Sequence, residues 1–339
     1  MVTGTGMLSA LGNDVTSTWE NLVAGRSGIG TITRFDPSRL TARIAGEVKD
    51  FDPSAVLDRK EQRRTDRYVQ YTLVATRQAV DQAGLPDRLE GGPAERTGMI
   101  IGAGLGGVES LFEQTLLLGE RGPERLSPFM IPMAIGNLAA GQVAISFGPT
   151  GPNFTVASAC ATGGHAIGEA WETIRRDDAD IMFAGGSEAG LHSGLVGGLA
   201  AMRALSTRND DPTAASRPFD RGRDGFVYGE GADVLVLEEL GHALTRGATP
   251  LIEIVGDVIA HAASTPEGDR AELQGLRTLF GERTGCVPPT INLEYPDEAA
   301  AGLDLTPNTA RTREMDVAIS NSFGFGGQNS AVVFRRWTE

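Results

Sequence analysis

The chain has 339 residues, enough for two domains or for one large composite core. Hydrophobic residues make up 40% and charged residues 22%, which is ordinary for a globular protein, and no apolar run is long enough to span a membrane. The net charge of −14 argues against nucleic acid as a partner, and the N-terminal residues lack the pattern of a signal peptide.

The cysteine and histidine content argues against disulfides and against a metal centre. Only Cys160 and Cys286 are present, without paired spacing, and none of the four histidines stands at metal-ligand spacing from another. We therefore expect no bound metal, and we expect a reducing, cytoplasmic environment.

A basic run at residues 59–67 precedes the first clear helical segment. Such a run is either the solvated start of a helix or a local docking patch for an acidic partner. Residues 66–83 then carry apolar side chains at helical spacing, and Gly84 and Pro86 end the pattern. We therefore expect a helix over 66–83.

Residues 99–101 predict a buried strand, which is followed by the glycine-rich loop 102–107 and by helical residues through Leu116. Glycines spaced in this way between a strand and a helix match the dinucleotide-binding motif. No clear second strand ends in a ribose-binding acid, so a tight strand–helix turn is the alternative. A nicotinamide-dependent oxidoreductase stays a competing function, which a titration with NADPH tests.

The residues around Cys160 carry the strongest chemical signal in the chain. The β-prone residues Phe154 and Val156 precede Cys160, and a helical pattern that includes Ile167 and Trp171 follows at once. We therefore expect Cys160 on a tight strand-to-helix turn at a helix N-terminus, where the helix dipole favours the reactive thiolate. The alternative is a buried, inert cysteine.

The remaining β-rich runs complete the pattern of alternating elements. We expect strands at 179–184, closed by the glycines at 185–186, and at 234–237, 317–319 and 331–334. Because these runs alternate with amphipathic helices, the sequence predicts an α/β fold.

A cysteine nucleophile needs a histidine nearby in space, and two of the histidines are candidates. His165 lies one helical turn after Cys160, where we expect it to pack against the turn. His261 precedes a turn-forming cluster at 264–269. It is a candidate catalytic group, with a structural role as the alternative.

Several blocks of the sequence together resemble the β-ketoacyl-(acyl-carrier-protein) synthases of fatty acid and type II polyketide synthesis, and most of all the elongating type II enzymes. The blocks span residues 2–12, 203–210, 216–227, 287–293 and 321–327. They extend over nearly the whole chain, and their combination is highly specific.

The resemblance implies a thiolase-like fold, in which two similar α/β halves form a five-layer αβαβα sandwich. We expect the N-terminal half at 1–240 and the C-terminal half at 241–339. By the same resemblance, Cys160 is the nucleophile, and the backbone amides of Cys160 and Phe325 form the oxyanion hole.

The acyl pocket that the resemblance implies is gated by Phe325 and includes Gly326, Gly327 and Thr265. The implied reaction is a decarboxylative Claisen condensation in which Cys160 first takes up an acyl group as a thioester. A malonyl thioester then loses carbon dioxide, two histidines stabilise the enolate, and the enolate attacks the acyl group. The product is a β-ketoacyl-carrier protein two carbons longer, and the reaction requires no metal or organic cofactor.

The second half departs from the family pattern. The motif His-Gly-Thr-Ser-Thr-Pro appears at 261–266 with alanine at its second and third positions. The block Lys-Ser-Met-Thr-Gly-His-Leu, which supplies the second histidine and a lysine, has no counterpart. Segments are thus missing near residues 256–263 and 281–285, and they include interior strands of a sheet.

A sheet without its interior strands leaves backbone groups unpaired. There are two explanations: the protein itself lacks these segments, or the sequence joins pieces of a protein that contains them. We favour the second explanation. Consecutive Cα atoms well over about 3.8 Å apart would then mark both joints, and the catalytic role of His261 would be open.

The resemblance implies acyl carrier protein, together with malonyl and acyl thioesters, as the partner, and it implies a homodimer. The candidate docking residues match basic positions of the family and are Lys60, Arg63, Arg64, Arg125 and Arg208. The alternative function is a catalytically incomplete ketosynthase-like subunit that binds carrier protein or an active partner. The presence of Cys160 argues against this alternative, because the family's non-condensing subunits replace it, whereas the missing histidine block argues for it.

Overall fold

The computed structural model of the chain describes residues 1–258, 284–324 and 327–338. His261, Thr265, Phe325 and Gly326 lie outside the described residues. The two suspected joints fall largely on the same undescribed residues, so the expected chain gaps stay predictions.

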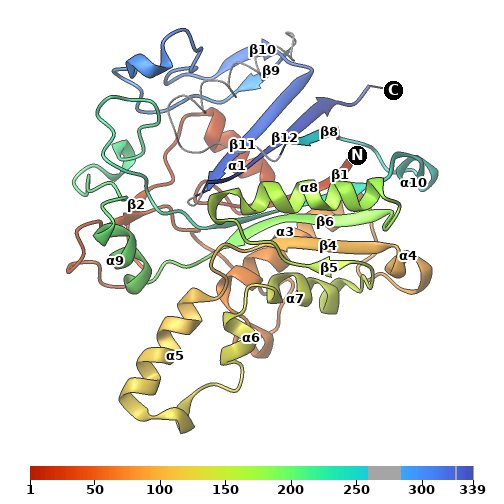
Figure 1. Cartoon of the computed structure of the whole chain (residues 1–339), viewed down its shortest axis with the longest axis horizontal. Helices are drawn as coiled ribbons and strands as arrows, with labels where there is room; N and C mark the ends of the chain where they lie inside the picture. Colours follow the sequence, from red (N-terminus) through yellow and green to blue (C-terminus); the bar gives the residue numbers. More distant parts are fainter. Residues whose placement is uncertain (259–283, 325–326, 339) are drawn as a thin grey trace.

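Among the described residues, eight strands form one mixed sheet, which Figure 1 shows through the middle of the molecule. The strand order is β11-β12-β8-β1-β7-β6-β4-β5. The strands are β1 (Val2–Leu8), β4 (Thr97–Gly102), β5 (Asn153–Phe154), β6 (Ile181–Glu188), β7 (Gly231–Glu238), β8 (Ile252–Val258), β11 (Val317–Gly324) and β12 (Gln328–Arg336).

The sheet divides into two parts at the boundary between β1 and β8. In the first part, β4 pairs parallel with β5 and β6, while β7 pairs antiparallel with β6 and β1. In the second part, β8, β12 and β11 pair antiparallel. A single residue pair, Val2 with Ile252, joins the two parts. The sheet can therefore bend sharply at this boundary.

Helix α3 (Arg67–Ala83) covers one face of the first part, together with α7 (Leu138–Phe147). It begins where the Asp66 carboxylate accepts the N–H of Tyr68, and it ends at Gly84, whose φ of 65° lies in the left-handed region. The expected stripe of apolar residues on this helix is buried. The helix predicted over 66–83 is thus confirmed.

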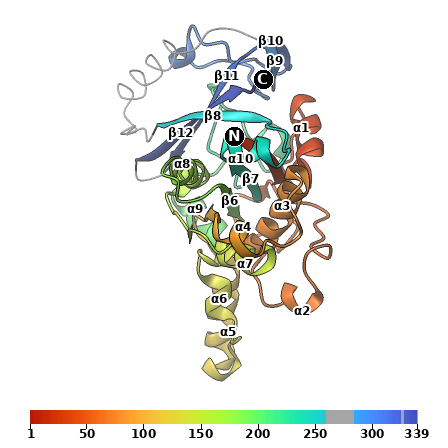
Figure 2. The same ribbon diagram turned by 90° about the vertical axis from the view of Figure 1, so that its right-hand side faces the viewer.

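Helix α8 (Thr162–Arg175) covers the opposite face and packs against both parts of the sheet. Its apolar face contacts β4 and β6 of the first part and Ile254 and Val332 of the second. In Figure 2, α8 accordingly lies between β12 and β6, with α3 beyond β7. The described residues thus form a helix–sheet–helix–sheet stack, four of the five layers that a thiolase-like fold has.

Shorter elements complete the described chain. The further helices are α1 (Val15–Val23), α2 (Arg59–Gln62), α4 (Gly91–Glu95), α5 (Val108–Arg121), α6 (Met130–Ala134), α9 (Ser193–Ala201) and α10 (Leu240–Thr245). Short 3₁₀ turns lie at η1 (Pro123–Arg125), η2 (Ala159–Ala161), η3 (Pro212–Ala214) and η4 (Glu298–Ala300). Two small hairpins pair β2 (Gly30–Thr31) with β3 (Ile44–Ala45) and β9 (Thr284–Val287) with β10 (Arg311–Glu314).

The expected strands are found with different bounds, and the expected end of the strand at 179–184 is wrong. The strand predicted to close at residues 185–186 continues as β6 to Glu188 and stays paired with β7 along its whole length. A side chain at Gly185 would overlap the carbonyl oxygen of Asp233, and one at Gly186 would lie 3.3 Å from Gly163 Cα. These glycines allow close packing inside the sheet, so they do not mark a turn.

Candidate active site

Cys160 lies in η2, directly before α8, so the predicted position at a helix N-terminus is confirmed. Its side chain is exposed. Thr162 fixes the turn, because its Oγ1 accepts the N–H of Ser158 at 2.8 Å and donates to the Ala159 carbonyl at 2.7 Å. Ala159 has a φ of 49°, in the left-handed region. A strained residue directly before the candidate nucleophile is typical of a functional turn.

Glycines allow the second part of the sheet to approach this turn closely. A Cβ at Gly324, the last residue of β11, would lie 2.6 Å from the Ser158 carbonyl oxygen and 3.4 Å from the Ala161 nitrogen. A Cβ at Gly164 would lie 2.5 Å from Ser330 Oγ of β12. The end of β11 therefore lies beside the Cys160 turn.

His165 connects the turn to β12. Its Nδ1 lies 2.6 Å from Ser158 Oγ, and its Nε2 lies 2.9 Å from the Asn329 carbonyl oxygen. Both ring nitrogens are thus engaged, as expected for a histidine that packs against the turn. His165 lies about one helical turn after Cys160 and connects the Cys160 turn with β12.

Cys160 opens into a cavity of about 850 Å³. Its walls come from β6, β7, α8, α9, β11, β12 and the loop 102–107. The titratable side chains that line it within the described chain are Cys160, Glu188, Tyr228 and Asp233. The volume is that of a site for a small-molecule substrate.

The loop 102–107 closes one side of this cavity. Its Leu105 N–H donates to Glu188 Oε2 at 2.9 Å, and a Cβ at Gly104 would lie 3.2 Å from the same oxygen and 3.7 Å from the Ala159 carbonyl oxygen. Gly104 therefore lies between a carboxyl group and the nucleophile turn. This packing accounts for a glycine at position 104 without a bound dinucleotide.

Two carboxyl groups of the cavity were not identified from the sequence. Burial raises the pKa of Glu188 to about 7, against opposing hydrogen bonds from backbone N–H groups that include that of Leu105. Burial alone raises the pKa of Asp233 to about 6. A polar residue inside an otherwise apolar strand is the signal that could have identified Asp233.

The other two described histidines have structural partners. His192 Nδ1 accepts the N–H of Gly194 at the start of α9, and its ring stacks on Phe112. His242 Nδ1 lies 2.6 Å from Glu238 Oε1. Neither lines the cavity at Cys160, so the described residues do not supply the enolate-stabilising histidines.

The candidate docking residues occupy different settings. Lys60, Arg63 and Arg64 are exposed on and just after α2, and Arg125 is exposed on η1. Arg208 is half-buried, and its guanidinium donates to the Gly222 carbonyl at 2.6 Å. The structure thus brings together the α2 residues, while Arg208 supports a loop.

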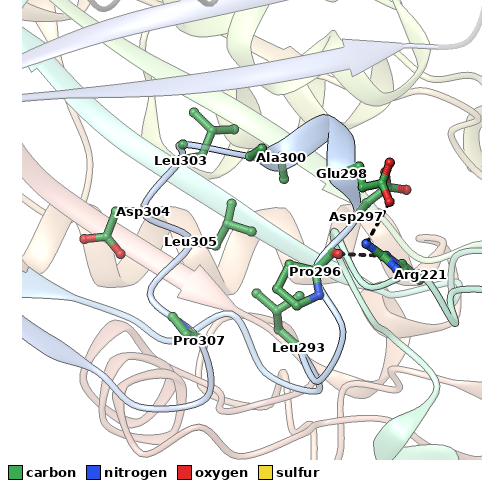
Figure 3. Close-up of a pocket in the computed structure, with 12 residues that line it drawn as sticks. Arg221, Leu293, Pro296, Asp297, Glu298, Ala300, Leu303, Asp304, Leu305 and Pro307 are labelled. Atoms are coloured by element: carbon green, nitrogen blue, oxygen red, sulfur yellow. Dashed lines mark hydrogen bonds and ion pairs between the residues drawn. The ribbon is translucent and has the colours of Figure 1, made fainter.

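A second cavity, of about 420 Å³, lies between Arg221 and the loop 293–307 (Figure 3). Arg221 spans its rim by donating to the Pro296 carbonyl and to Glu298. The side chains around it include no cysteine or histidine. Among the described residues, the candidate nucleophile Cys160 therefore lines the first cavity and not this one.

Comparisons with known proteins agree with this geometry. Residues 1–243 match the model of the β-ketoacyl synthase N-terminal domain. The 3-oxoacyl-[acyl-carrier-protein] synthase 2 of Coxiella burnetii is 40% identical over 408 aligned residues, with 99% of this chain and 98% of the relative covered. That of Vibrio harveyi is 39% identical, with 100% and 99% covered. An alignment of 408 positions exceeds the 339 residues of this chain, so several tens of positions of the relative have no counterpart here.

Solved structures give the same result. A β-ketoacyl synthase from Burkholderia phymatum STM815 superposes with a TM-score of 0.85 at 27% identity, and the match covers 99% of both chains. A type II polyketide ketosynthase, solved in complex with its acyl-carrier protein and bound to the hexaketide, superposes at 0.82 with 25% identity, over 99% of this chain and 98% of that one. The fold is therefore thiolase-like, and the chain belongs to the β-ketoacyl synthase family.

Proposed function

We propose that the chain catalyses a decarboxylative Claisen condensation between an acyl group held as a thioester on Cys160 and malonyl-acyl-carrier protein. The observation that carries this proposal is an exposed cysteine at the N-terminus of α8, open to a cavity of about 850 Å³, in a chain of this family. The product is a β-ketoacyl-carrier protein two carbons longer. Curated relatives named 3-oxoacyl-[acyl-carrier-protein] synthase 2 support the same activity.

The position of Cys160 suits the first half-reaction. The α8 dipole and the free N–H groups of a helix start stabilise a thiolate, which attacks the acyl thioester and expels the carrier thiol. We place the developing oxyanion between the backbone amides of Cys160 and Phe325. The close approach of Gly324 to the Ser158 carbonyl oxygen supports this placement.

The second half-reaction needs hydrogen-bond donors for the enolate. We propose His261 as one of them, and we assign Phe325, Gly326, Gly327 and Thr265 to the acyl pocket. The domain boundary proposed for this site lies between residues 240 and 241, so that the nucleophile comes from the first half and His261 from the second.

We propose that acyl carrier protein docks on the exposed basic residues of α2. Lys60, Arg63 and Arg64 lie together on one short segment, and Arg64 is held over the Phe129 ring at 4.6 Å, next to α6. We assign Arg125 to the same docking surface and Arg208 to its periphery. The triple variant K60E/R63E/R64E should weaken carrier binding, most of all at low salt. An affinity equal to that of the wild type would contradict this assignment.

We also propose that the chain is a cytoplasmic homodimer. Strand β5 lies at one edge of the sheet, with Phe154 exposed. Helix α7 packs against β5. Large apolar side chains are exposed on α7, on α5, and on and just after α6: Leu111, Leu116, Leu118, Ile131, Ile135 and Ile145. An edge strand flanked by exposed apolar residues is typical of a surface that another chain covers. None of the helices in the described part of the chain combines the length and apolar character that crossing a membrane requires.

The decisive experiment separates the two half-reactions. The protein is incubated with an acyl thioester, and the acyl adduct on Cys160 is measured by mass spectrometry, with C160A as the control. Malonyl-carrier protein is then added, and carbon dioxide release and β-ketoacyl product are measured. We expect an adduct that C160A lacks, followed by condensation. Absence of the adduct would refute the proposal, and an adduct without condensation would assign the alternative role of a carrier-binding subunit.

A further inference from the structure

Two carboxyl groups line the cavity that holds Cys160, on adjacent strands. Along the β6–β7 ladder, Gly186 pairs with Asp233 and Glu188 pairs with Gly231. Paired residues point to the same face of a sheet, as do residues two apart on one strand. Glu188 and Asp233 are therefore diagonal neighbours on the face that α8 covers, about 7–8 Å apart by the usual sheet geometry.

Gly186 explains why both carboxyl groups lie beside the nucleophile turn. Without a side chain at this position, the first residues of α8 approach the sheet, and a Cβ there would lie 3.3 Å from Gly163 Cα. Asp233 lies across the ladder from Gly186, and Glu188 lies two residues further along β6. Both acids consequently flank the start of α8, which directly follows the Cys160 turn.

Within the described part of the chain, Glu188 has a buried carboxyl oxygen without a partner, and Asp233 lines the cavity. Oε1 of Glu188 is buried and makes no hydrogen bond, although Oε2 accepts the N–H of Leu105. Asp233 is half-buried and lines the cavity, and burial is the one cause of its raised pKa. No lysine, arginine or histidine lines the cavity within the described part of the chain.

The protonated form of each carboxyl group is accessible near neutral pH. Burial raises the pKa of Glu188 to about 7 and that of Asp233 to about 6. A protonated carboxyl group carries an O–H donor. Where such a donor faces the cavity, an oxygen atom of the molecule that occupies the cavity can accept its hydrogen bond.

We propose that the acyl cavity is built for an oxygenated acyl chain, whose carbonyl or hydroxyl oxygen accepts hydrogen bonds from Glu188 and Asp233. The proposal rests on the function proposed above and names the substrate class of that site. Glu188 and Asp233 are then specificity-determining residues, while Cys160 remains the nucleophile.

A saturated chain fits this cavity less well. It would cover both carboxyl groups with methylene groups and leave their hydrogen-bonding atoms unpaired, which is unfavourable in a buried site. Sites that hydrogen-bond a substrate oxygen discriminate strongly against the analogue that lacks it. We expect discrimination of about threefold to tenfold for each hydrogen bond.

The test compares acyl chains of equal length. Wild-type protein is incubated with hexanoyl, 3-hydroxyhexanoyl or 5-oxohexanoyl thioesters of N-acetylcysteamine, and the rate of Cys160 acylation is followed by mass spectrometry. We expect at least one oxygenated chain to react about tenfold faster than hexanoyl. Equal rates for all three chains, or a preference for hexanoyl, would overturn the inference.

Variants then assign the preference to the two residues. D233L and E188L remove the donors, so they should abolish or reverse the preference, whereas D233N and E188Q keep a donor in a similar volume and should retain it. D210N, which removes an exposed carboxylate, is the matched control and should leave the ratio of rates unchanged. Thermal melting identifies any leucine variant that fails to fold, and in that case the amide variants and the wild-type ratio decide.

The two proposals fail differently. If none of the three thioesters acylates Cys160, the proposed function itself is refuted. If Cys160 is acylated at the same rate by oxygenated and saturated chains, only the substrate class is refuted.

Discussion

The two faces of the first part of the sheet are built differently. On the face covered by α3, packing is close: side chains at Gly4 and Gly6 would overlap the carbonyl oxygens of Ala79 and Ala75. Asp66, buried at the start of α3, accepts hydrogen bonds from Tyr68 and from Ser110.

On the face covered by α8, the same strands enclose a cavity. Asp233 has no hydrogen bond or ion pair there among the described residues, and one oxygen of Glu188 is buried without a partner. The comparison indicates that the α3 face supplies stability, while the α8 face carries a functional site at the expense of stability.

The largest expected effect tests the close packing on the α3 face. In G6A the new methyl group collides with the Ala75 backbone of α3, so helix and strand must separate. We expect a loss of at least about 3 kcal/mol in the free energy of unfolding, measured by urea denaturation. G256A, in β8, is the matched control, because a Cβ there meets nothing within 4 Å. Equal losses in the two variants would contradict the contrast between the regions.

Three other glycines, Gly84, Gly185 and Gly186, show where prediction from the sequence succeeds and where it fails. The bounds of α3 follow from local signals, the Asp66 cap and Gly84, and the position of Cys160 follows from the abrupt change to a helical pattern. The prediction that this strand ends at residues 185–186 is wrong, because Gly185 and Gly186 match a local turn signal but lie within β6. Their actual role depends on β7 and α8, which approach from distant parts of the sequence.

The cavity carboxyl groups could not be predicted for a similar reason. A polar residue within an apolar strand is visible in the sequence, as Asp233 is between Ala232 and Val234. Whether it finds a partner, faces water or lines a cavity depends on how α8 and β12 pack over that position. The resemblance to a family predicts Cys160 as the nucleophile, whereas only the structure indicates which side chains line the cavity beside it.

The second prediction removes a partnered carboxylate from the α3 face. D66A deletes the cap of α3 and leaves the buried N–H and O–H of Ser110 without their acceptor. We expect a loss of about 2–3 kcal/mol in the free energy of unfolding. D66N keeps one acceptor oxygen and should lose about half as much. A neutral D66A variant would show that these hydrogen bonds do not stabilise the α3 face.

The third prediction has the opposite sign and concerns the cavity face. The folded-state pKa of Asp233 is raised to about 6 from an ordinary value of 3.8, so the protonated carboxyl group favours the folded state. This contribution to the free energy of unfolding is fully present below pH 3.8 and is lost as the pH rises through 6. D233N cannot ionise. We expect it to exceed the wild type by about 2 kcal/mol at pH 8 and to match it near pH 4, as measured by urea denaturation at both values. A D233N variant that is less stable than the wild type at pH 8 would show that the Asp233 carboxylate has a partner.

The smallest expected effect on stability tests the connection between the Cys160 turn and β12. H165A removes the contacts of both ring nitrogens, to Ser158 Oγ and to the Asn329 carbonyl, and should lower the free energy of unfolding by about 1 kcal/mol. The rate of Cys160 acylation should fall further, by about tenfold, because the turn that aims the thiolate loses its support. H242A is the control, since its partner Glu238 lies outside the cavity, and its acylation rate should not change.

A double-variant cycle separates positioning by His165 from a general loss of packing. If the hydrogen bond between Ser158 and His165 positions the turn, S158A and H165A remove the same interaction, and the double variant should be acylated no more slowly than H165A alone. If the effects multiply, each residue acts independently of the other, and the hydrogen bond is not what holds the nucleophile in place. The acylation rate is the better readout here, because a 1 Å displacement of a nucleophile slows a reaction far more than it changes stability.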